Sequence, residues 1–196
     1  IKANNMKVNV VVLMADKIRT LSSNTQNLLT LAACIGNQFD FATLSVISGM
    51  DIDNLKSDLR EALTEGIVIP TEGGYKFAHD RIQQSAYSLI PETDKAATHL
   101  KIGRLLLHSA TGEKQAAQLF DIADHYNQGL QLLEGEEKMQ LLELNRKAAL
   151  RAKNSSAFQH ARKYVEMAIK LLPATAWKSN YPLALELYTL AAEITF

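Results

Sequence analysis

The stretch Tyr75-Lys-Phe-Ala-His79-Asp80 ends in two polar residues that are the best candidates in the sequence for binding a ligand. A short β-like run from Tyr75 to Ala78 stops at His79-Asp80, and a helical pattern begins at once. Asp80 is expected to be the N-cap of that helix, because its carboxylate can accept hydrogen bonds from the free amides of the first turn. The His79 imidazole then lies beside the positive end of a helix, where phosphate groups bind readily.

The other candidate residues do not form a catalytic or metal-binding pattern. The histidines occur singly along the sequence, and the sequence lacks phosphate-loop, dinucleotide-binding and zinc-protease motifs. His125 follows Asp121 and Asp124, a triplet that could suggest a metal site, but a zinc site would need further ligands. We therefore interpret that triplet as a solvated helix end. The sequence predicts no catalytic residue, no metal ligand and no enzymatic activity for this chain.

Composition narrows the possible partners. The 196 residues are 47% hydrophobic and carry 21 basic and 21 acidic side chains, a formal net charge of zero. This balance argues against nucleic-acid and membrane-surface binding, which need an excess of basic charge. The single cysteine, Cys34, lies in an apolar run and is expected to be buried. These features predict a cytoplasmic protein without a membrane-spanning segment.

Residues 1–90 show the element order of a winged-helix domain. Apolar spacing predicts a helix over residues 10–21, and capping residues and glycines delimit three more short helices, which end at Gly36, Gly49 and Gly66. The expected N-caps are Ser22, Ser23 or Asn24 for the first of these, Asp40 for the second, and Asp51 or Asp53 for the third. A β-hairpin is predicted from Ile67 to Ala78, packed on the preceding helices, with a turn at "TEGG".

Residues 91–196 are predicted to be antiparallel helices joined by short loops. The expected helices span 92–109, 114–127, 136–153 and 155–172, and a last one begins near Tyr181. Within this region, Leu141 to Pro173 matches the length of a tetratricopeptide repeat, about 34 residues. "ARKYVEMAIKLLP" is similar to the second helix of that repeat, whereas the first helix fits it poorly. An irregular helical bundle is the alternative. The predicted fold class is mainly α, with one small β-hairpin.

Four stretches together resemble one family: "SSNTQNLLTLAACIGNQFDFATLSVISG", "LREALTEGIVIP", "YKFAHDRIQQSAYSLIPE" and "HLKIGRLLL". They are similar to the region that follows the ATPase core in large bacterial hybrid sensor kinases, which combine serine/threonine-kinase-like, AAA/STAND-type ATPase, helical-repeat and histidine-kinase domains. The resemblance covers nearly the whole chain. It departs from the family pattern at Arg60, where an aromatic residue is expected. It implies that the chain is a piece of a longer protein.

The resemblance also implies a role for His79. Ala78-His79-Asp80 looks like the Met-His-Asp motif of STAND ATPases, with alanine in place of methionine. In that class the histidine contacts the β-phosphate of bound ADP and holds the closed state. His79 would then contact a nucleotide in the longer protein, where ATP or ADP with Mg would be the cofactor. The alternative is structural: His79 bonds a backbone carbonyl and Asp80 caps the helix.

Three functions are compatible with the sequence. The first is a non-catalytic regulatory segment that couples an upstream ATPase domain, and other domains of the same chain, to signalling output. The second is a DNA-binding winged helix, whose recognition helix over residues 54–66 would carry more acidic than basic side chains. The third is a free-standing helical-repeat scaffold for protein partners. We expect the first, with no cofactor held by this segment alone.

Overall fold

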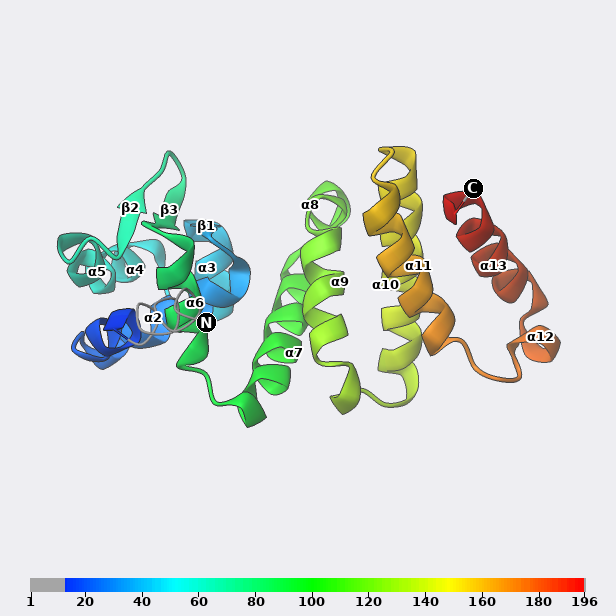
Figure 1. The fold of residues 1–196 in the computed structure, drawn as a ribbon, viewed down its shortest axis with the longest axis horizontal. Coiled ribbons are helices and arrows are strands. Elements are labelled where there is room, and N and C mark those ends of the chain that lie inside the picture. The colour runs from blue at the N-terminus through cyan, green and yellow to red at the C-terminus, as the bar shows by residue number, and fades with distance from the viewer. Residues whose placement is uncertain (1–12, 196) are drawn as a thin grey trace, which may run out of the picture. The chain divides into compact units, whose positions relative to one another are not determined.

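The computed structural model describes residues 13–195 and is mainly helical, with one small antiparallel sheet (Figure 1). This confirms the predicted fold class. The chain divides into two compact units between Lys95 and Ala96, near the boundary of 90/91 expected from the sequence. We call them unit 1 and unit 2. The division falls inside helix α7 (Glu92–Ser109). Every helix in the described residues is too short or too polar to cross a membrane.

The helices of unit 1 begin where side chains can satisfy their free amides. Residues 13–19 are helical, and the earlier part of the expected 10–21 helix lies outside the described residues. The side chains of Ser22, Asp40 and Asp51 accept from backbone amides at 3.3, 2.7 and 2.9 Å and cap the next three helices, as predicted. The helices of this unit are α2 (Ser23–Ile35), α3 (Phe41–Ser48), α4 (Ile52–Asp58), α5 (Arg60–Thr64) and α6 (Asp80–Ser88).

One predicted helix is divided in the structure. The pattern over residues 54–66 predicts a continuous helix, but α4 and α5 are separated at Leu59. Leu59 stays in the right-handed region with φ −83° and ψ −5°, but its ψ lies far from the value of about −42° of a regular α-helix, and its side chain is fully buried. Packing of this leucine in the core thus accompanies the break. Arg60, the departure from the family pattern, is exposed at the start of α5.

The sheet of unit 1 has three strands in the order β1-β3-β2. The predicted hairpin is confirmed: β2 (Val68–Pro70) pairs antiparallel with β3 (Gly74–Phe77), with Val68 opposite Phe77. The third strand, β1 (Gln38–Asp40), pairs with the other edge of β3 and was not predicted. Three residues are too short to show the two-residue period of a strand. Only Phe39 of this strand is buried.

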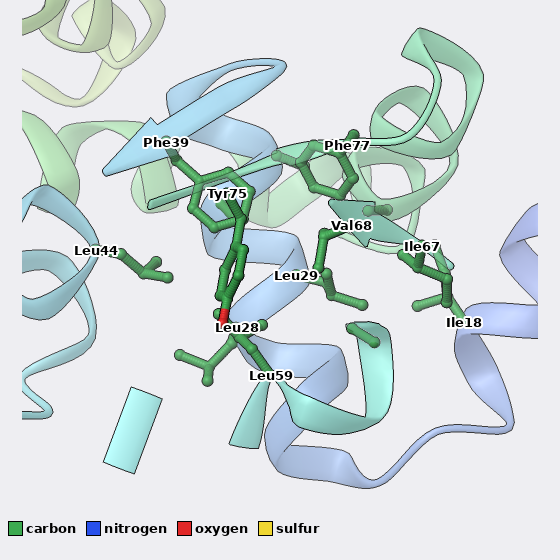
Figure 2. Close-up of a cluster of buried hydrophobic side chains, with 14 of the residues drawn as sticks. Ile18, Leu28, Leu29, Phe39, Leu44, Leu59, Ile67, Val68, Tyr75 and Phe77 are labelled. Atoms are coloured by element: carbon green, nitrogen blue, oxygen red, sulfur yellow. The ribbon is translucent and has the colours of Figure 1, made fainter. Parts of the chain in front are cut away.

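The core of unit 1 lies between the sheet and the helices. Figure 2 shows Phe39 of β1 and Tyr75 and Phe77 of β3 directed toward apolar side chains that include Leu28 and Leu29 of α2. The ring of Phe39 lies 5.6 Å from that of Phe77 and 6.3 Å from that of Tyr75. These rings contact one another on one face of the sheet, and that face packs on apolar side chains of the helices.

Cys34 also confirms its predicted place in the interior. The cysteine is buried in α2, and burial raises the pKa of its thiol to about 12. The positive charge of Lys95 opposes this rise in the thiol pKa. A thiol with such a high pKa stays protonated at neutral pH and behaves as a small apolar side chain.

Unit 2 consists of consecutive helices that pack on their neighbours. Helix α9 packs on α10, α10 on α11, and α11 on α13; Figure 1 shows α10 and α11 side by side. The expected helix over 114–127 is divided at Gln118, and the repeat type stays a prediction. The elements after α7 are α8 (Gly112–Ala117), α9 (Leu119–Gln128), the 3₁₀ helix η1 (Leu130–Leu132), α10 (Gly135–Asn154), α11 (Phe158–Leu171), α12 (Ala176–Ser179) and α13 (Tyr181–Thr195).

Small side chains explain how closely α10 and α11 approach. Ala149 of α10 and Ala161 and Ala168 of α11 are fully buried. The two helices are joined at residues 155–157, close to the predicted connection, and Ser156 adopts a left-handed conformation with φ 60°. A short connection of this kind makes the helices antiparallel neighbours. The pair is the most extensively packed part of unit 2 and forms its centre.

Candidate functional site

The candidate site is the corner at which β3 ends and α6 begins. His79 occupies the N-cap position of α6, with an extended backbone of φ −155° and ψ 146°. Its ring atom Nδ1 accepts a hydrogen bond from the amide of Arg81 at 3.1 Å. Its backbone carbonyl accepts the first helical bond, from the amide of Ile82, at 2.8 Å. His79 therefore satisfies one of the amides that a helix start leaves without a partner.

Asp80 is not the N-cap that the sequence predicted. The helix begins at Asp80, and the residue that caps it is His79. The extended backbone of β3 continues through His79, and the N-cap is the residue with such non-helical angles. Asp80 lies in the first helical turn, where a carboxylate interacts favourably with the positive end of the helix dipole. Its contribution to the helix is thus electrostatic.

The cap assigns a protonation form to the His79 ring. An acceptor nitrogen carries no proton, so a neutral ring whose Nδ1 accepts from Arg81 carries its proton on Nε2. Because the side chain is exposed, Nε2 can donate this proton to an external acceptor such as a phosphate oxygen. A doubly protonated ring would lose the bond from Arg81. The neutral form therefore combines helix capping with one outward donor.

Backbone hydrogen bonds hold the strand side of the corner. The amide of Phe77 donates to the carbonyl of Asn37 at 2.8 Å. The next amide, that of Ala78, donates to the carbonyl of Ile67 at 3.0 Å. The Phe77 side chain is almost completely buried, so the chain immediately before His79 is fixed in the core of unit 1.

The helix side of the corner is held by α2. The side-chain amide of Gln83 donates to the carbonyl of Ala33 in α2 at 3.1 Å. Ser85 is fully buried and donates its hydroxyl proton to the carbonyl of Arg81 at 2.6 Å. Rotation of α6 about its axis would break the bond from Gln83 to α2, whereas the Ser85 bond lies within α6 and satisfies a buried hydroxyl.

We expect His79→Ala to lower the free energy of unfolding of unit 1 by about 1 kcal/mol, since the variant loses the N-cap bond. His79→Asn should retain most of the wild-type stability, because asparagine is among the preferred N-cap residues. Urea unfolding followed by circular dichroism would compare the two variants. Equal destabilisation by alanine and asparagine would show that the ring does not act as a cap.

The structure joins two histidines that the sequence showed as unrelated. His99 of α7 and His125 of α9 are both buried, and their Nδ1 atoms lie 2.8 Å apart, a hydrogen-bonding distance. Burial, together with the charge of His99, lowers the pKa of His125 to about 4, and Asp124 opposes the shift. The helical spacing of His99 with the buried Ala96 and Gly103 was the sequence signal that could have placed it inside.

The interpretation of His125 as part of a solvated helix end was therefore wrong. His125 is only 5% exposed, because the inward face of α9 carries it against α7. Asp124 instead forms an ion pair with Lys163 at 2.7 Å. Within residues 13–195, the structure shows no group of three or more His, Cys, Asp or Glu side chains that could hold a metal ion.

Comparison with known proteins gives one distant relative. The chain is 24% identical, over an alignment of 243 residues, to hybrid signal transduction histidine kinase G of Dictyostelium discoideum. The alignment covers 92% of this chain and 7% of the relative. No protein-family model matches the chain. No solved structure matches it significantly. The chain is thus distantly similar to one segment of a much longer signalling protein, and that relative is eukaryotic, so the bacterial setting of the resemblance stays a prediction.

Proposed function

We propose that this chain is a non-catalytic regulatory segment of a multidomain signalling kinase, in which it couples a nucleotide-binding domain to the output of the protein. The observation that carries the proposal is the similarity to a hybrid signal transduction histidine kinase across 92% of the chain. A similarity that extends through both units favours a common origin of the whole segment. The upstream nucleotide-binding domain and other domains of the same chain would be its partners.

Unit 1 would serve as a winged-helix domain. Its order of helix α2, strand β1, helix α3, the two helical pieces α4 and α5, and the hairpin, together with the strand order β1-β3-β2, supports this assignment. The DNA-binding alternative gains no support from the helical pieces before the hairpin. Lys56 of α4 lies over the ring of Phe41 at 5.1 Å, and the carboxylate of Glu61 in α5 accepts from the amide of Ser22 at 2.8 Å.

Unit 2 would serve as a tetratricopeptide-like connector. The antiparallel pair of α10 and α11, its buried alanines and the following Pro173 support this assignment. Side-by-side helices joined by short connections transmit a displacement at one end along the stack, because neighbouring helices are in direct contact. A free-standing protein-binding scaffold is the alternative function for this unit.

His79 would be the contact between this segment and the nucleotide. In the longer protein, the ring would donate from Nε2 to a phosphate of ADP held with Mg by the upstream domain. The exposed ring, its Nδ1 bond to the Arg81 amide and its place at a helix N-terminus support this role. Asp80 would not contact the phosphate, because its negative charge would repel it.

The test is ADP release from the full-length protein. Removing a hydrogen bond to a charged group costs about 1.5–3 kcal/mol, so His79→Ala should accelerate ADP release about tenfold or more. His79→Asn keeps the cap without the ring, and we expect it to accelerate release as well. Asp80→Ala is the control: it keeps the ring of His79 and removes a charge that repels phosphate, so ADP release should not accelerate. Unchanged release in both His79 variants would leave the histidine with only its structural role.

A further inference from the structure

Unit 2 contains a cavity of about 380 Å³ between α9, α10 and α11. Figure 1 shows the start of α9 and the connection from α10 to α11 at the same end of this unit, and the cavity lies at that end. Its volume is near the lower limit of small-molecule sites, which measure about 300–1,000 Å³. The side chains in its wall include Phe120, Asp124, Ala152, Ser155, His160 and Tyr164.

One side of the cavity is aromatic. The rings of Phe120 and Tyr164 are stacked, with their centroids 5.6 Å apart. Tyr164 is almost completely buried, and Ala152 beside it in the wall is fully buried. Burial, the charge of Asp124 and a hydrogen bond to that carboxylate raise the pKa of the Tyr164 hydroxyl, which therefore stays protonated at neutral pH. This side can hold the apolar body of a ligand, and aromatic walls favour an aromatic ring.

The carboxylate in the wall already has its partners. Asp124 accepts from the ammonium group of Lys163 at 2.7 Å, and the hydroxyl of Tyr164 hydrogen-bonds to it as well. Asp121, one turn earlier on α9, has an interaction of its own. A cationic ligand would have to compete with Lys163 for the charge of Asp124. The acidic side chains near the cavity therefore do not favour a cation.

Two hydrogen-bond donors at the cavity remain available. The guanidinium of Arg151 lies 5.4 Å from the centre of the Phe120 ring and donates to the carbonyl of Ala116. Within residues 13–195 it forms no ion pair with a carboxylate. The ring of His160 is exposed in the wall, and even its neutral form has one N–H to donate. Charge and donors together favour an anionic group on the ligand.

A strained residue holds the connection that closes the cavity. Ser156 has φ 60° and is the one non-glycine residue with a positive φ in the part of the chain that the structure describes. Its neighbours Ser155 and Ala157 both line the cavity. A left-handed backbone is unfavourable for a residue with a Cβ, and such residues are concentrated at ligand sites. This turn is a second feature that favours a binding site.

We propose that this cavity binds a small aromatic carboxylate. The ring of the ligand lies against Phe120 and Tyr164, and its carboxylate accepts from the guanidinium of Arg151 and the ring of His160. A ligand held by three helices at once stabilises their arrangement, because it binds only the folded unit. The site therefore allows a small molecule to regulate unit 2. It does not depend on the proposed nucleotide contact of His79.

Titration of the complete chain with benzoate, followed by the amide resonances in ¹⁵N NMR spectra, tests the proposal. We expect saturable shifts at residues 120–124 and 151–164, with a dissociation constant on the order of 1 mM. Benzylammonium has the same ring with the opposite charge, and acetate has the carboxylate without the ring. Each should bind at least about tenfold more weakly than benzoate, because each lacks one of the two features that the cavity fits.

Variants at the wall separate the parts of the site. His160→Ala and Arg151→Gln should each raise the dissociation constant of benzoate about fivefold, the effect of one hydrogen bond or one exposed ion pair. Lys170→Gln, which removes an exposed cation elsewhere on α11, is the control for charge and should leave the constant unchanged. Ala157→Phe should abolish binding, because its ring would occupy the cavity. Ala174→Phe, at an exposed alanine outside the cavity, is the matched control.

Three results would overturn the proposal. The first is the absence of saturable benzoate binding to the wild-type chain. The second is tighter binding of benzylammonium than of benzoate, which would reverse the charge assigned to the ligand. The third is equal benzoate affinity of the Ala157→Phe and Ala174→Phe chains, which would place the bound benzoate outside the cavity.

Discussion

Replacing Gly74 with alanine is expected to disrupt the pairing of β1 with β3 and to lower the free energy of unfolding of unit 1 by about 3 kcal/mol or more. An added Cβ would lie 2.1 Å from the carbonyl oxygen of Phe39 and 2.7 Å from the Cα of Asp40. Both neighbours are backbone atoms of β1, so no side-chain rotation relieves the overlap. The strand must move, and Phe39 is part of the core.

Gly73→Ala is the matched control, one residue earlier in the same turn. An added Cβ at Gly73 meets no atom within 4 Å, so the free energy of unfolding should change by less than about 0.5 kcal/mol. Amide hydrogen exchange at residues 38–40 and 74–77 would measure the loss of pairing directly. A Gly74→Ala protein as stable as Gly73→Ala, with protected strand amides, would contradict the structure of this turn.

The expected loss extends to the candidate site. Gly74 begins the strand whose last residue, Phe77, fixes the chain just before His79. A displaced β3 would change the extended backbone that makes His79, and not Asp80, the N-cap. In the longer protein, Gly74→Ala should therefore accelerate ADP release by displacing His79, if the proposed nucleotide contact exists.

Local signals made several parts of this fold predictable. The caps at Ser22, Asp40 and Asp51, and the hairpin after Gly66, depend on a few consecutive residues. Such turn and cap preferences are readable in sequence. Strand β1 could not be predicted, because its pairing partner β3 lies about 35 residues later and its own pattern has only Phe39. Its existence depends on tertiary contacts.

The candidate site was predictable in position but not in detail. The change from β-like to helical pattern placed His79 at a corner. N-cap preferences favour aspartate, so the sequence assigned the cap to Asp80. The ring-to-amide bond of His79 depends on backbone angles that only the structure gives. For the same reason the pairing of His99 with His125 could not be derived, since these residues lie 26 positions apart and meet only through the packing of α7 with α9.

Unit 2 is expected to lose stability as the pH falls from about 6.5 toward about 4. Burial and His99 lower the pKa of His125 from 6.5 to about 4. Between these values the unfolded chain binds a proton at this position and the folded chain does not, so protonation favours unfolding. The contribution of the neutral, buried His125 to the free energy of unfolding is complete above pH 6.5 and is lost progressively toward pH 4. The total loss is up to about 3 kcal/mol.

Urea unfolding followed by Trp177 emission, in dilute protein, isolates unit 2, because this tryptophan lies in α12. Between pH 7 and pH 5, the free energy of unfolding of the wild type should fall by about 2 kcal/mol more than that of a His125→Gln variant. Glutamine keeps a hydrogen-bonding group next to His99 but does not titrate in this range. His160→Gln, which removes an exposed histidine from α11, is the control for the substitution itself. All other titrating groups contribute equally to the three proteins, and the difference between the two glutamine variants therefore measures the buried pair alone. An identical change of the free energy of unfolding with pH in all three proteins would mean that His125 binds a proton as readily in the folded as in the unfolded protein, which its burial next to His99 opposes.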